Sequence, residues 1–116
     1  MQVEIAGVDV DEAANRQMRD LMGEDFADLL ETYLSGGEAY VAQILQGFEA
    51  QDFAALENAA HPLKSSSRNL GAVRVASLAQ NIEHYAKAQD AVAMAEYVGQ
   101  IGDAFAAAKS ALNGGV

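Results

Sequence analysis

Apolar residues recur every three or four positions along almost the whole chain, and this spacing restricts the fold more than any other feature. Between residues 25 and 49 it is carried by nine side chains: Phe26, Leu29, Leu30, Tyr33, Leu34, Val41, Ile44, Leu45 and Phe48. Residues three and four apart share one face of an α-helix, so this run predicts a long helix with one buried side. The sequence shows no clear alternation of apolar and polar residues of the kind that marks a half-buried strand. We therefore expect an all-α protein.

Interruptions of this spacing divide the chain into five helical segments. We expect a short helix over 11–22, with Asp9 or Asp11 near its N-cap, and longer helices over roughly 25–49, 52–70, 72–88 and 90–112. Glycines in Ser35–Gly37 weaken the second helix, but its apolar stripe resumes in phase, so we expect it to continue. Four amphipathic helices with short connections favour an antiparallel up-down four-helix bundle, a single domain over 1–116 with a short N-terminal capping helix.

Composition narrows the class of protein further. Apolar residues make up 51% of the chain, which argues against disorder despite a formal net charge of −10. Polar residues interrupt every apolar run before it reaches membrane-spanning length, and the first residues include acids but no basic run typical of a secretory signal. Seventeen acidic against seven basic residues disfavour nucleic acid as a partner, and the absence of cysteine excludes disulfides and thiolate metal sites. A cytoplasmic protein is expected.

The segment AAHPLKSSSRNLGA, residues 59–72, contains one of two histidines followed directly by the only proline. On a helix, His61, Lys64, Ser65 and Arg68 form one stripe, opposite the stripe of Leu56, Leu63 and Leu70. If the leucines face the core, the imidazole faces water beside two cations. With Arg74, this segment and its surroundings hold three of the seven basic residues, which suits a single phosphoryl group better than a duplex. The simpler interpretation is that these three cations are ordinary solvated side chains on a helix surface.

Three chemical roles are open to an exposed imidazole in this setting. A general base would need a pocket, an oxyanion hole or a second carboxylate, and none is indicated by the sequence. A metal ligand would need partners, but His84 is far away in sequence and Glu57, four residues before His61, is a weak signal. A phosphoryl carrier needs an accessible ring nitrogen and nearby positive charge, and the stripe provides both.

The same segment closely resembles the phosphorylation motif of histidine-containing phosphotransfer (HPt) domains. Eight positions agree in place: His61, Leu63, Lys64, Ser66, Ser67, Leu70, Gly71 and Ala72. The family's four-helix bundle with a short N-terminal helix also fits the length and helical pattern of this chain. The resemblance therefore covers both the local motif and the whole architecture.

The resemblance implies specific roles for residues of this chain. His61 would be the phosphoacceptor, Lys64 would stabilise the phosphoryl group, and Glu83 on the following helix would orient the imidazole by accepting from its inner N–H. A partner would bind around His61 through Ser65, Arg68, Gly71, Ala72 and Arg74. Glu83 can also be read as an ordinary solvated acid near a helix end.

Two residues depart from the family's usual pattern or complicate it. Ser65 stands where the family usually has glycine, on the exposed stripe, where a small residue lets a partner approach closely. Pro62 fills a variable position, but it removes a backbone donor and leaves the Asn58 carbonyl without its helical partner. We expect the third helix to continue through Pro62 with a modest bend. The second histidine, His84, lacks a matching motif and is interpreted as an ordinary surface or boundary residue.

The resemblance implies a phosphoryl carrier of a multistep two-component phosphorelay, without kinase activity of its own. It would accept a phosphoryl group on His61 from an aspartyl phosphate on the receiver domain of a hybrid sensor kinase and donate it to a response regulator. No cofactor is expected on this chain, and Mg²⁺ would be held by the partner receiver. Neither nucleic acid nor membrane is expected as a partner, and the protein is expected to be a monomer.

Two alternatives stay open on the sequence alone. A degenerate HPt-like bundle would bind a receiver without carrying phosphate, because Pro62 misdirects the imidazole. A plain helical adaptor would share the motif only by coincidence.

Overall fold

The computed structural model describes residues 2–114, so the ends of the expected domain over 1–116 lie outside the described residues. In this part of the chain the regular elements are all helical, which confirms the all-α fold. The helices are α1 (Glu12–Met22), the 3₁₀ turn η1 (Gly23–Asp25), α2 (Phe26–Ala50), α3 (Phe53–Leu70), α4 (Val73–Lys87) and α5 (Ala91–Gly114). Within residues 2–114, no helix is long and apolar enough to cross a membrane.

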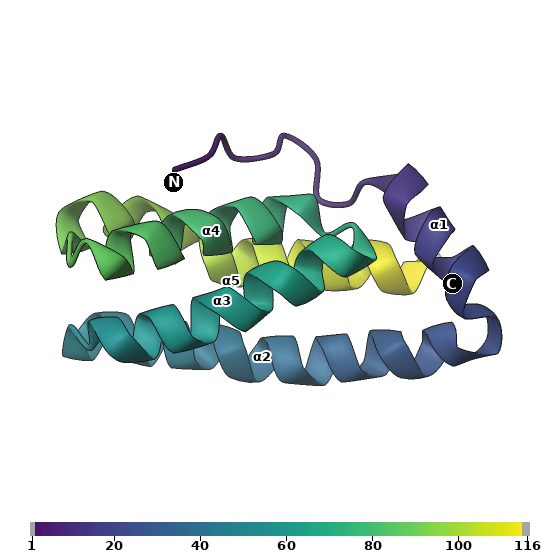
Figure 1. The fold of residues 1–116 in the computed structure, drawn as a ribbon, viewed down its shortest axis with the longest axis horizontal. Coiled ribbons are helices and arrows are strands. Elements are labelled where there is room, and N and C mark those ends of the chain that lie inside the picture. The colour runs from purple at the N-terminus through teal and green to yellow at the C-terminus, as the bar shows by residue number, and fades with distance from the viewer. Residues whose placement is uncertain (1, 115–116) are drawn as a thin grey trace.

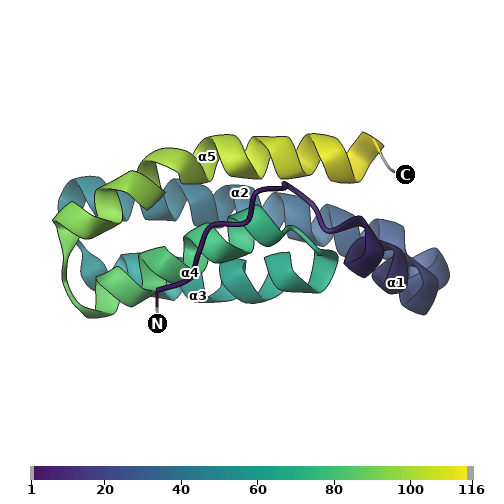
Figure 2. The ribbon, with the colours of Figure 1, turned by 90° about the horizontal axis from the view of Figure 1, so that it is seen from above.

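Helices α2 to α5 form an up-down bundle in which each helix packs against two others (Figure 1). Helix α3 contacts α2 and α4, and α5 closes the bundle by contacting α4 and α2. Short turns make this order possible. The α2–α3 turn uses Gln51 with a positive φ of 54°, and the α3–α4 turn uses Gly71 with a φ of 79°. Helix α1 caps the end of the bundle near that second turn (Figures 1 and 2).

Side-chain caps and an apolar interior explain why the helices begin and pack as they do. Asp11 and Asp52 accept hydrogen bonds from the backbone N–H groups of Ala14 and Ala55, so they satisfy donors at the starts of α1 and α3. The apolar stripes meet in one core that includes fully buried residues from α2 to α5: Ile44, Leu56, Leu63, Leu70, Val75, Leu78, Ile82, Met94 and Ile101. Helix α2 continues through the glycines, where Gly37 makes room for the Phe105 ring.

Residues 2–10 form an extended segment that runs along the bundle beside α4 (Figures 1 and 2). Asn81 binds this segment in both directions, since its Oδ1 accepts from Val3 N–H at 2.7 Å and its Nδ2 donates to Val3 O at 2.8 Å. The backbone N–H of Ala6 donates to Ser77 Oγ at 3.1 Å. The helical pattern of the sequence did not indicate this segment, because an extended segment bound through its backbone leaves little side-chain signal.

Candidate functional site

His61 lies on α3, which continues without interruption through Pro62. The continuous helix agrees with the expected path of the chain, while the expected bend stays a prediction. The proline carbonyl accepts a hydrogen bond from Ser66 Oγ at 2.9 Å. The buried leucine stripe of α3 turns His61 outward, and 63% of its side chain is exposed. The imidazole is therefore presented to solvent from a regular helix.

Glu83 on α4 holds the inner side of this imidazole. His61 Nδ1 lies 2.6 Å from Glu83 Oε2, and only 8% of the Glu83 side chain is exposed. Burial opposes ionisation of Glu83, but hydrogen bonds and charge from Lys64 and His61 outweigh it and lower the pKa of its carboxyl group below 4.5. Because an ionised carboxylate only accepts hydrogen bonds, Nδ1 carries the proton, and in the neutral imidazole Nε2 keeps the free lone pair.

Lys64 points to the same carboxylate rather than standing free beside the imidazole. Its Nζ donates to Glu83 Oε1 at 2.6 Å, and 17% of its side chain is exposed. The two oxygens of Glu83 thus bind two different residues of α3, one turn apart. This arrangement fixes the carboxylate and, through it, the plane of the His61 ring.

Two further charged residues, Glu57 and Lys87, belong to this neighbourhood, and the sequence motif assigns them no role in phosphoryl transfer. Lys87 Nζ lies 3.9 Å from Glu83 Oε2 and 3.9 Å from Glu57 Oε1. Glu57 precedes His61 by one helical turn, and Lys87 follows Glu83 by one turn. That spacing is the signal that could have identified both residues. They line an open hollow beside the imidazole with Asn58, His61, Pro62 and Glu83.

Of the five expected partner-binding residues, only two are exposed. Ser65 and Arg68 are exposed on the His61 side of α3, and Arg68 donates to Gln80 Oε1 on α4. A groove lies between α2 and α3; it is lined by Tyr33, Tyr40, Pro62, Ser66 and other residues and has a volume of about 250 Å³. Sequence reasoning missed this groove, because it forms only where two helices pack.

The structure corrects the expectation for Gly71 and Ala72, which are both buried. Gly71 O accepts from Asp11 N–H at 2.7 Å, so the start of α1 covers this turn. A Cβ on Gly71 would lie 2.8 Å from Asp11 O, and the residue has a positive φ that disfavours any side chain. These residues therefore pack the end of the bundle and offer no surface for direct contact with a partner.

Arg74 is also placed differently from the expectation. Its guanidinium donates to Ala6 O at 3.2 Å and to Gly7 O at 2.7 Å, and it lies 3.1 Å from Asp9 Oδ1. It is nine residues before Glu83, which corresponds to about 14 Å along α4. Arg74 therefore holds the N-terminal segment and does not join Lys64 beside His61.

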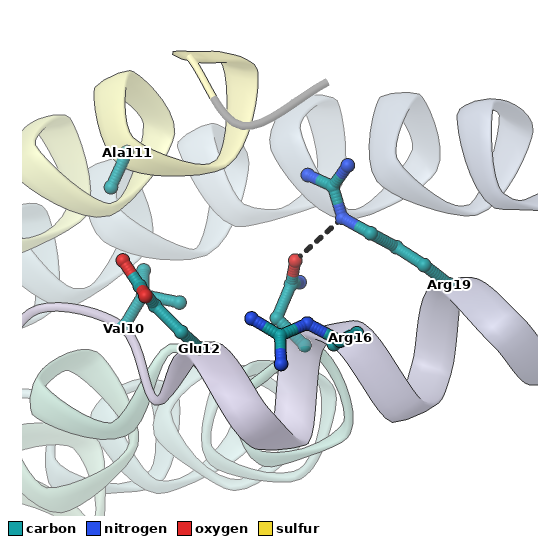
Figure 3. Close-up of a pocket in the computed structure, with 6 residues that line it drawn as sticks. Val10, Glu12, Arg16, Arg19 and Ala111 are labelled. Carbon is teal, nitrogen blue, oxygen red and sulfur yellow. Dashed lines mark hydrogen bonds between the residues drawn. The ribbon is translucent and has the colours of Figure 1, made fainter.

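Other candidate positions lie apart from the His61 face. His84 is half-buried and packs edge-on against Tyr85, with ring centroids 4.8 Å apart. A pocket between α1 and α5 contains Arg16 and Arg19, and Arg19 Nε donates to Asn15 Oδ1 (Figure 3). This pocket includes no residue of the predicted site.

Among residues 2–114 there is no cluster of three or more histidine and acidic side chains arranged to hold a metal ion.

Comparisons with known proteins bear on the family and the fold of this chain. The family model of the Hpt domain matches residues 28–111, most of the chain. Among solved structures, the chain is similar to histidine-containing phosphotransfer protein B (HptB) from Pseudomonas aeruginosa PAO1, with a TM-score of 0.86 and 22% sequence identity over 94% of this chain and 95% of that one. A search of curated proteins found no match. At this identity the structural likeness establishes a shared fold, and the evidence for the family comes from the family model.

Proposed function

Because the chain belongs to the Hpt domain family, we propose that it is a phosphoryl carrier of a multistep phosphorelay. His61 accepts a phosphoryl group from the aspartyl phosphate of a receiver domain, and a response regulator receives it in turn. The observation that supports this role most is the contact of Glu83 with Nδ1, which leaves Nε2 of an exposed ring available for attack.

The transfer follows from the tautomer of the neutral imidazole, in which Nδ1 carries the proton and Nε2 the lone pair. The Nε2 lone pair attacks the phosphorus, the Nε2–P bond forms, and the P–O bond to the aspartyl carboxylate breaks with its electrons on the leaving oxygen. The ring becomes positively charged while Nδ1 keeps its proton. The Glu83 carboxylate, which accepts that proton's hydrogen bond, offsets the new charge. Return of the phosphoryl group to a second aspartate reverses these changes.

Several roles in this proposal belong to the partner rather than to this chain. Mg²⁺ is expected on the receiver, where it neutralises the phosphoryl oxygens during an in-line transfer. The chain itself acts as a carrier without kinase activity. The receiver docks over the groove between α2 and α3 beside the exposed Ser65 and Arg68. A monomer leaves this face accessible to both partners.

Transfer of a radioactive phosphoryl group from a phosphorylated receiver tests the proposal. The chain should acquire a label that is labile in acid and stable in base, the signature of a phosphohistidine. His61→Gln should abolish the label, while His84→Gln should retain it. Binding of the receiver without label would instead support the degenerate HPt-like bundle, and neither binding nor label would support the plain helical adaptor.

A further inference from the structure

Two carboxylates, those of Glu57 and Glu83, line the hollow beside His61. Glu57 lies one helical turn before His61 on α3, and Glu83 contacts the ring itself. A phosphoryl group adds a charge of about −1.5 to −2 at neutral pH. The Glu83 carboxylate balances the positive ring of the phosphorylated imidazole, but like charges at short range oppose each other, so the Glu57 carboxylate disfavours the added phosphoryl charge unless a cation balances it.

Lys64 cannot balance both carboxylates from its position. Its ammonium binds Glu83 Oε1, whereas His61 Nδ1 contacts Oε2. Lys87 is placed differently, because its ammonium lies 3.9 Å from both Glu83 Oε2 and Glu57 Oε1. Lys87 therefore bridges Glu57 of α3 and Glu83 of α4, and it approaches the same Glu83 oxygen, Oε2, that contacts His61 Nδ1.

We propose that Lys87 is a positioning residue that balances the charges of Glu57 and Glu83 and thereby stabilises the phosphorylated form of His61. This inference rests on the proposed carrier function. Lys87 is 59% exposed and sits in the last turn of α4, so its side chain can follow a change in charge without a change in the fold. A cation at this end of a helix is also favourable for the helix dipole.

The chain offers a matched control for this lysine. Lys109 also forms an ion pair between helices, with its Nζ 2.9 Å from Glu38 Oε1, and both side chains are about half exposed. This pair joins α5 to α2, outside the hollow beside His61. Loss of either lysine removes one positive charge from an acidic protein, but only Lys87 lies near the imidazole.

The test compares the equilibrium fraction of phosphohistidine formed with a phosphorylated receiver. Lys87→Gln should lower the phosphohistidine-to-histidine ratio by about two- to fivefold, the range expected for exposed ion pairs, whereas Lys109→Gln should leave it unchanged. Lys87→Arg should retain the wild-type ratio, and Glu57→Gln added to Lys87→Gln should restore much of the loss. The difference should shrink at about 1 M salt, where the Debye length is about 3 Å.

The outcomes separate this inference from the carrier function. A labelled wild type in which Lys87→Gln behaves like Lys109→Gln overturns the role of Lys87 alone. So does a defect that Glu57→Gln does not relieve or that salt does not reduce, since a structural defect would behave in that way. An unlabelled wild type overturns the carrier function itself.

Discussion

His61 on α3 and Glu83 on α4 are 22 residues apart in sequence, yet His61 Nδ1 and Glu83 Oε2 are separated by only 2.6 Å. The short turn through Gly71 and Ala72 folds the two helices against each other and creates this pair. Lys64 binds the second oxygen of the same carboxylate. The three residues form one network, which connects the buried interior to an exposed imidazole.

Glu83→Ala should slow phosphoryl transfer to His61 by about tenfold or more. Removal of the residue that orients a metal-binding histidine has an effect of this size in other proteins. Without the carboxylate, the ring can rotate and Nδ1 no longer keeps the proton preferentially. Nitrogen NMR of the imidazole should then show a changed tautomer ratio. Glu83→Gln should lose less, because its carbonyl oxygen still accepts from Nδ1–H. Equal transfer rates in the wild type and Glu83→Ala would contradict an orienting role.

The stability provided by Glu83 should depend on pH in one direction. Its pKa is lowered from 4.5 in the folded protein, so the folded state favours the ionised carboxylate. Its contribution is therefore fully present above about pH 4.5 and is lost as the pH falls through the lower folded value. Urea unfolding should show that the wild type has a higher free energy of unfolding than Glu83→Gln near neutral pH. This difference should shrink as the pH falls through the pKa of Glu83 in the folded protein. A difference that grows on acidification would contradict the assignment.

Two adjacent glycines of α2 should respond oppositely to alanine. A Cβ at Gly37 would overlap the Phe105 ring, so Gly37→Ala should destabilise the protein by about 1–3 kcal/mol. A Cβ at Gly36 meets no atom within 4 Å, so Gly36→Ala should stabilise the helix by up to about 1 kcal/mol. Thermal unfolding of both variants measures the contrast. Similar effects at the two positions would argue against the packing of α2 on α5.

Removal of the Asn81 side chain should release the N-terminal segment. Asn81 is fully buried and makes two hydrogen bonds to Val3, so Asn81→Ala should cost about 1–3 kcal/mol of stability. Hydrogen exchange should accelerate at the amides of Val3 and Ala6, which donate to side chains of α4 in the wild type. Asn69→Ala, at an exposed position of α3, is the control. Unchanged exchange at Val3 in Asn81→Ala would show that Asn81 does not hold the segment.

The amino-acid sequence by itself determined the all-α class and the outward position of His61. Both follow from local periodicity, because residues three and four apart share a helix face wherever the helix lies. The same periodicity placed Leu56, Leu63 and Leu70 inside, and it explains why one proline does not interrupt α3.

Only the tertiary structure decided which charged residues surround the imidazole. Helix packing brought Lys64 to Glu83 and Lys87 to Glu57, buried Gly71 beneath α1, and turned Arg74 to the N-terminal segment. These contacts join residues distant in sequence, and their geometry depends on how the helices pack rather than on the spacing within any one of them. The motif could therefore single out His61 and Lys64, and the resemblance Glu83, but the contacts that join these residues to one another, and Lys87 to Glu57, were set by the packing of α3 against α4.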